Sequence, residues 1–207
     1  MTETVIICGT GPSITQEQIS LCNNARKAGK AKVFGANRAY EIFDIDLLHA
    51  CNFQFWDLHW PKVKDLPFEK WTTRPGLNYD GLNYIEEIWI DGLSTDPKTI
   101  SAHHGTGPQL LNLAYHFGFK RLLLVGWDMR FPGKVSDRKY TQKRRYLGED
   151  PLTSNHWPKT EANGDLGGLI REVETIIPED YGIEIINCTP NSALKCFPMM
   201  ELSDCLT

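Results

Sequence analysis

The sequence predicts an α/β fold in which a mostly parallel sheet carries helices on both faces. Short apolar runs rich in β-branched residues alternate along the chain with stretches of helical periodicity. Parallel strands need crossover connections, and right-handed crossovers place helices on both faces of the sheet. The length of 207 residues and the hydrophobic content of 41% fit one core, so we expect a single domain over residues 1–207.

The first half of the chain begins with a strand, a helix and two more strands. Residues 5–8 form a β-branched apolar run, and residues 15–28 carry apolar side chains at helical spacing. Residues 31–35 and 47–51 are predicted as the next strands, with a short helical turn at residues 40–43 between them. This β-α-β rhythm is typical of a Rossmann-like sheet.

The rhythm breaks over residues 53–98, which are rich in tryptophan and proline. Only residues 84–90 within this stretch alternate like a strand. We therefore interpret residues 53–98 as an aromatic-rich insertion. The rhythm resumes with a helix predicted over residues 106–117 and a strand predicted over residues 121–126.

The last third of the chain is predicted to hold a loop, a helix and a strand. Residues 131–159 are polar and basic with little periodic apolar content, which predicts a mobile lid loop over the sheet. Residues 161–177 are predicted to form a helix and residues 183–187 the last strand. Ligands of such folds bind beyond the carboxyl ends of the strands, where the strand order reverses.

The loop after the first predicted strand reads Gly9-Thr10-Gly11-Pro12-Ser13 and leads into a helix. Its glycines allow backbone N–H groups to approach a phosphate at the positive end of that helix, with Ser13 as the helix cap. The loop lacks the third glycine of a dinucleotide fingerprint and the Gly-Lys-Ser/Thr of a P-loop. A plain tight turn with an N-cap residue is the alternative.

Further polar residues follow strands or open a helix at the same edge. Asn37 and Asn52 each come directly after a predicted strand, where an amide can bind a sugar or base, although either alone is typical of a turn. Gly105 and Thr106 open the next predicted helix, whose N-terminus can hold an anion. Asp128 ends a central strand, where it can bind a ligand hydroxyl or fix a loop.

Two residues of the predicted lid loop are candidates for catalysis. His156 can act as a general base because imidazole titrates near neutral pH, and a solvated loop histidine is the alternative. Tyr140 lies near Lys143 and Arg144, and its hydroxyl can steady a leaving phosphate together with one of them. A surface aromatic residue that covers the loop is the alternative for Tyr140.

Two pairs of possible metal ligands are unconvincing, and we predict no metal site. His103 and His104 are adjacent, point in different directions and have no third ligand at a suitable spacing. Asp44 and Asp46 flank an isoleucine at the start of a predicted strand.

Composition argues against several classes of protein. The net charge of −4 gives no general attraction to nucleic acid. No apolar run approaches the ~20 residues of a membrane-spanning helix, and the first residues lack the pattern of a signal peptide. The six cysteines form no Cys-x-x-Cys pair and are expected to be reduced thiols. We expect a cytoplasmic protein, and the oligomeric state stays open.

A series of motifs occurs in an order shared with one family. Residues 7–13 read Ile-Cys-Gly-Thr-Gly-Pro-Ser, residues 124–128 Leu-Val-Gly-Trp-Asp, residues 155–157 Asn-His-Trp and residues 189–192 Thr-Pro-Asn-Ser. This series resembles the bacterial sialyltransferases of glycosyltransferase family 42, which are metal-independent and single-domain. It resembles the pterin diphosphokinase-like group more distantly.

The resemblance implies nucleotide-binding roles for residues at the predicted edge. Asn37 and Asn52 fall where the nucleotide-contacting asparagines of the family lie, and Asn191 and Ser192 fall in its terminal Pro-Asn-Ser motif. Thr10 stands where the loop of the family has an asparagine.

The resemblance also implies a reaction. The leading hypothesis is a metal-independent glycosyltransferase that takes a nucleotide-activated sugar, a CMP-sugar by resemblance, and a hydroxyl acceptor, with His156 as base, Tyr140 on the leaving phosphate and no required cofactor. One alternative is a Mg²⁺-dependent diphosphotransferase in which Asp128 helps to place magnesium. Another is a non-catalytic nucleotide- or partner-binding module.

Overall fold

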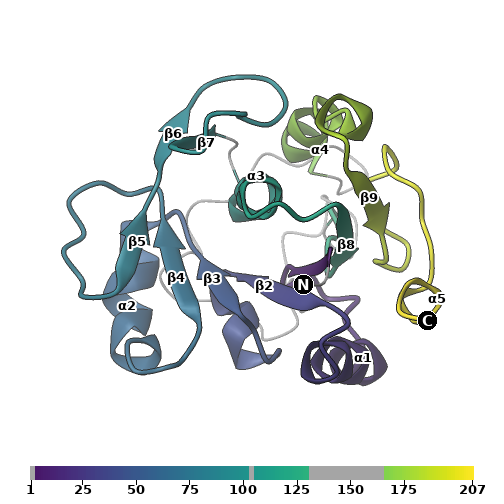
Figure 1. Cartoon of the computed structure of the whole chain (residues 1–207), viewed down its shortest axis with the longest axis horizontal. Helices are drawn as coiled ribbons and strands as arrows, with labels where there is room; N and C mark the ends of the chain where they lie inside the picture. The colour runs from purple at the N-terminus through teal and green to yellow at the C-terminus, as the bar shows by residue number, and fades with distance from the viewer. Residues whose placement is uncertain (1–2, 103–104, 131–165) are drawn as a thin grey trace, which may run out of the picture.

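A seven-stranded sheet, parallel at every pairing, forms the centre of the molecule (Figure 1). The computed structural model describes residues 3–102, 105–130 and 166–207. The strand order is β5-β4-β3-β2-β1-β8-β9. Its strands are β1 (Thr4–Cys8), β2 (Lys32–Ala36), β3 (Leu47–His49), β4 (Glu69–Thr72), β5 (Leu82–Tyr84), β8 (Arg121–Val125) and β9 (Glu184–Asn187). The predicted Rossmann-like α/β fold is confirmed.

Helices cover both faces of the sheet, so its central strands are buried on both sides. One face carries α1 (Gln16–Lys27), α2 (Phe53–Val63) and α5 (Leu202–Cys205). The other carries α3 (Thr106–His116), α4 (Gly167–Glu174) and the small parallel sheet of β6 (Glu86–Ile88) and β7 (Thr99–Ser101), as Figure 1 shows.

The central position of β1 in the sheet explains why its sequence is an unbroken apolar run. Ile6 and Cys8 pack among the side chains of α1 and α2, whereas Val5 and Ile7 pack among those of α3. All four side chains are completely buried. A parallel strand covered on both faces needs apolar residues at every position, unlike an alternating surface strand.

Residues 53–98 are not an insertion, because part of the main sheet is built from them. They supply α2, β4 and β5, and β4 and β5 extend the sheet beyond β3. The strand predicted over residues 84–90 is divided at Ile85 between β5 and β6, which belong to different sheets. Short edge strands and an aromatic helix lack the β-branched periodicity on which the prediction depended.

The strand order reverses between β1 and β8. After β1 the chain adds β2, β3, β4 and β5 on one side, and it then crosses by α3 to place β8 against the other edge of β1. The crevice outside the carboxyl ends of these two strands is the usual ligand site of an open α/β sheet. In the described ranges no helix has both the length and the apolar character needed to cross a membrane.

Candidate functional site

The loops that follow β1 and β8 are locked together by backbone hydrogen bonds. The amide of Gly9 donates to the carbonyl of Val125 at 2.8 Å, and the amide of Gly11 donates to the carbonyl of Gly126 at 3.0 Å. A Cβ atom at Gly11 would lie 1.8 Å from Asp128 Oδ2 and 2.6 Å from the oxygen of Gly126. The glycines are therefore required for the close approach of the two loops.

Asp128 completes this junction through its carboxylate. Oδ1 accepts from the backbone amide of Ser13 at 3.1 Å, and Oδ2 accepts from the hydroxyl of Ser13 at 3.0 Å. Burial raises the pKa of Asp128, and the bonds from Ser13 oppose that rise. Of the two roles that the sequence left open for Asp128, the structure supports the fixing of a loop.

Ser13 is not the helix cap that the sequence predicts. Helix α1 begins at Gln16 with Thr15 as its N-cap, in a capping box where the Thr15 side chain accepts from the amide of Gln18 and the Gln18 side chain accepts from the amide of Thr15. The Ser13 hydroxyl is used by Asp128 instead. A threonine followed three residues later by glutamine was the available sequence signal.

These bonds occupy most of the backbone amides by which the glycine loop was predicted to bind a phosphate. The amides of Gly9, Gly11 and Ser13 all bond within the protein, and Pro12 has no amide hydrogen. The amide of Thr10 has no hydrogen-bond partner among the described residues. Thr10 thus presents the unused backbone donor of this loop.

The Pro-Asn-Ser segment and the residue after it are hydrogen-bonded to the loop that follows β8. The Ser192 hydroxyl donates to the carbonyl of Trp127, and the amide of Ala193 donates to the carbonyl of Asp128 at 2.8 Å. Asn191 is exposed and has a positive φ of 55°. The structure therefore gives Ser192 an architectural role beside the crevice and leaves the Asn191 side chain at the surface.

Asn37 and Thr106 meet at the carboxyl end of β2. Asn37 has a φ of 52°, and its Oδ1 accepts from Thr106 Oγ1 at 3.4 Å. Thr106 Oγ1 also lies 3.2 Å from Cys51 Sγ. Gly105 is the N-cap of α3 and makes no side-chain cap, while Asn52 is exposed at the N-cap of α2 and its side chain makes no cap bond there. Asn37 and Asn52 thus follow neighbouring strands, as predicted.

A polar chain that sequence reasoning missed continues this edge toward β4. Arg74 donates through Nε to the carbonyl of Cys51 and pairs through Nη1 with Glu87 at 3.2 Å. Gln109 Nε2 donates to Glu87 at 3.2 Å, and Gln109 Oε1 lies 2.8 Å from Nε2 of the buried His49. Burial lowers the pKa of His49, although its bonds to Gln109 and Trp71 act in the opposite direction.

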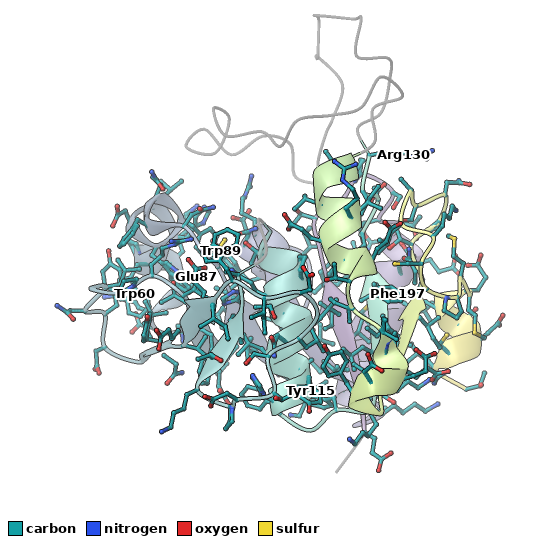
Figure 2. All side chains as sticks on the ribbon, turned by 90° about the horizontal axis from the view of Figure 1, so that it is seen from above. Trp60, Glu87, Trp89, Tyr115, Arg130 and Phe197 are labelled. Atoms are coloured by element: carbon teal, nitrogen blue, oxygen red, sulfur yellow. The ribbon has the colours of Figure 1, made fainter. Side chains whose placement is uncertain are left out.

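These residues lie in β3, β4, β6 and α3 and in the segments that follow β3 and β4, and no local motif links them. Their proximity follows from the strand order and from the small sheet that carries Glu87. Figure 2 shows Glu87 and Trp89 on one side of α3 and Arg130 on the other, near the end of α4. Trp89 has 71% of its surface exposed, which is high for a tryptophan.

The two predicted catalytic residues, His156 and Tyr140, lie outside the described residues, as does the predicted lid loop. Within the described ranges no three histidine, cysteine or acidic side chains form a cluster fit to hold a metal ion. Asp46 is engaged by Arg26 and Lys32 and accepts from the amide of Val33.

The fold and this edge define a Rossmann-like α/β domain with its candidate site at the β1/β8 reversal. No family model and no curated protein matches the sequence. Among solved structures the fold is similar to the MAf glycosyltransferase from Magnetospirillum magneticum AMB-1, with a TM-score of 0.64 and 12% sequence identity. The match covers 98% of this chain and 34% of that chain, so this chain spans about a third of that protein.

Proposed function

We propose that the chain is a glycosyltransferase-like enzyme that binds a nucleotide-activated sugar at the β1/β8 crevice and transfers the sugar to a hydroxyl acceptor. The observation that carries the proposal is the reversal of strand order between β1 and β8, with a glycine loop, Asp128 and the Pro-Asn-Ser segment gathered around it. The similarity in fold to a glycosyltransferase over nearly the whole chain supports the same class of reaction.

The donor is assigned to the edge that runs from Thr10 to Asn52. The amide of Thr10 is available for a phosphate, and the α1 N-terminus that follows this loop favours negative charge. Asn37 and the exposed Asn52 offer amides to the sugar or base of the nucleotide. A CMP-sugar is the donor that the sequence motifs favour.

The transfer requires a base and stabilisation of the leaving group. His156 takes the proton of the acceptor hydroxyl as its oxygen attacks the anomeric carbon, and the bond from that carbon to the phosphate oxygen breaks. Tyr140, with Lys143 or Arg144, donates hydrogen bonds to the departing phosphate. No metal is required in this scheme, and both Asp128 oxygens already accept hydrogen bonds from Ser13.

Nucleotide binding is the first test. Thermal unfolding is measured with CMP, UDP, GDP and adenine nucleotides, each with magnesium and with a chelator. We expect CMP to raise the melting temperature equally in both conditions. Binding abolished by the chelator favours the magnesium-dependent diphosphotransferase, and no stabilisation by any nucleotide favours the non-catalytic partner-binding module.

Transfer is the second test, in an assay with a radiolabelled CMP-sugar. His156→Ala is expected to lower the rate of transfer roughly 10²- to 10⁴-fold while leaving CMP binding intact, because a general base contributes about that factor. If His156 is instead a solvated loop histidine, His156→Ala would leave the rate unchanged, and that result would remove His156 from the mechanism.

A further inference from the structure

Arg74 is a half-exposed cation held in place at the carboxyl end of β4. Its Nε donates to the carbonyl of Cys51, and its Nη1 lies 3.2 Å from Glu87 Oε1. The side chain keeps 31% of its surface exposed. The guanidinium is therefore fixed on two sides and still open to solvent.

A buried chain of side chains fixes Glu87 in turn. Gln109 donates to Glu87 Oε2 at 3.2 Å, and its Oε1 lies 2.8 Å from His49 Nε2. His49 Nδ1 lies 3.0 Å from the carbonyl of Trp71. His49 and Gln109 have exposed fractions of 0% and 1%. A guanidinium supported in this way loses little conformational freedom when it binds a planar or tetrahedral oxyanion.

The arginine continues the edge proposed for the donor. Cys51, whose carbonyl accepts from Arg74, contacts Thr106 through its sulfur at 3.2 Å, and Thr106 donates to Asn37 at 3.4 Å. Arg74 is thus linked to Asn37 through two intervening residues across the ends of β2, β3 and β4.

Two donors in the segment that follows β4 lack acceptors. Nη2 of Arg74 has no partner among the described residues, and Thr73 Oγ1, one residue earlier, is buried without a hydrogen-bond partner. Buried polar groups in proteins are nearly always hydrogen-bonded, so the unpaired Thr73 hydroxyl is an unusual feature of the segment that carries Arg74. An oxyanion supplies acceptors suited to the exposed guanidinium of Arg74.

We propose that Arg74 anchors an oxyanion subsite that binds a phosphate or a carboxylate of the substrate, with Glu87, Gln109 and His49 as positioning residues. The assignment of that oxyanion to a sugar donor or acceptor rests on the proposed function. The binding of the anion itself does not, and it is measured without any nucleotide.

The test uses inorganic phosphate, N-acetylneuraminic acid and neutral N-acetylglucosamine as probes, at constant ionic strength, with thermal unfolding as readout. Arg74→Gln is compared with Arg121→Gln. Arg121 is a matched control at the amino end of β8: it is 32% exposed, pairs with Glu184 at 2.9 Å and donates to the carbonyl of Cys205. Arg74→Lys keeps the charge but not the forked geometry.

We expect Arg74→Gln to weaken anion binding roughly tenfold to a hundredfold, the range for loss of one charged hydrogen bond, while Arg121→Gln binds like the wild type. Arg74→Lys should retain part of the affinity. If Arg74→Gln does not fold, the anion affinity of Arg74→Lys tests the subsite in its place. Stabilisation by phosphate alone indicates the phosphate of the substrate, and stabilisation by the acidic sugar alone indicates its carboxylate.

The subsite is overturned if neither anion stabilises the wild type more than the neutral sugar does. It is equally overturned if the Arg74 variants bind the anions like the Arg121 variant. Failure of the nucleotide screen would remove the proposed function and leave this result standing, so the two outcomes are separable.

Discussion

Gly11 shows how one missing side chain fixes the geometry of the crevice. Its ideal Cβ position falls within 1.8 Å of Asp128 Oδ2, a distance that no real Cβ adopts. The residue therefore has a packing reason to be glycine that is independent of any phosphate. The same position lets the amide of Gly11 reach the carbonyl of Gly126.

We predict that Gly11→Ala lowers the free energy of unfolding by about 1–3 kcal/mol, the range for overpacking a well-packed site. Displacement of Asp128 should also weaken nucleotide binding. Chemical denaturation and the CMP titration measure these effects.

Gly168→Ala is the matched control for this substitution. Gly168 is exposed in α4, and a Cβ there meets nothing within 4 Å. Alanine at this position should raise stability by about 0.5–1 kcal/mol because glycine is the poorer helix former. Equal stability of the two variants would contradict the packing account of Gly11.

The residues of the site divide into those that local sequence reveals and those that it does not. Gly11 and Asp128 follow apolar strands directly, so the position of the strands placed them at the crevice. Arg74, Glu87 and Gln109 come from separate elements, and their meeting depends on the order of β3 and β4 and on the small second sheet. That order is a long-range property that hydrophobic periodicity does not encode.

Among the elements, those with a simple apolar pattern were predicted correctly from the sequence. Strands β1 and β8 are apolar at nearly every position, and α3 buries an apolar stripe. Helix α2 contains Pro61 near its end, and β4 reads Glu-Lys-Trp-Thr. Lys70 in β4 is buried and donates to the carbonyls of Leu66 and Phe68. A lysine so placed is atypical of a strand core, which explains why the sequence suggested an insertion.

The starts of α1 and α2 give a paired test at the scale of the element. Thr15→Ala removes a capping box and should lower the free energy of unfolding by about 1 kcal/mol. Asn52→Ala removes a side chain that makes no cap bond, so stability should stay within about 0.5 kcal/mol of the wild type. Urea denaturation measures both.

Nucleotide binding should separate the same two variants in the opposite sense. Asn52→Ala should weaken CMP binding because the amide is assigned to the donor, whereas Thr15→Ala should retain it. A large loss of stability in Asn52→Ala would show that the side chain is structural and would remove it from the proposed site.

On the scale of the whole molecule, Asp128 connects the two halves of the sheet. Its pKa is raised in the folded state, so the folded protein holds a proton more tightly than the unfolded chain does. Stability from this group is therefore greatest at acid pH and falls as the pH rises through the folded pKa. The affected window begins near the unfolded value of about 3.9 and extends upward.

We predict that Asp128→Asn removes this dependence. Asparagine can accept from the Ser13 amide and donate to its hydroxyl, so the loops stay joined without a buried charge. The free energy of unfolding of the wild type minus that of Asp128→Asn should decline from pH 4 upward and then level off. Urea titrations at a series of pH values measure it.

Asp128→Ala is the control for the hydrogen bonds themselves. It leaves the Ser13 donors without partners and should lower stability by about 1–3 kcal/mol near pH 4, with a deficit that shrinks as the pH rises because the variant also lacks the buried carboxylate. A flat difference between wild type and Asp128→Asn, or a difference that rises with pH, would contradict the role of burial in the pKa of Asp128.

The bond between Ser13 and Asp128 joins residues 115 positions apart in the chain. During synthesis, strands β2 to β5 emerge and can add to one side of β1 while its other edge waits for β8. Long-range pairing of this kind closes slowly, and an open central edge is exposed to wrong partners in the meantime. We therefore expect the junction of the β1 and β8 loops to form late, and the nascent chain to be most prone to aggregate before β8 has been made.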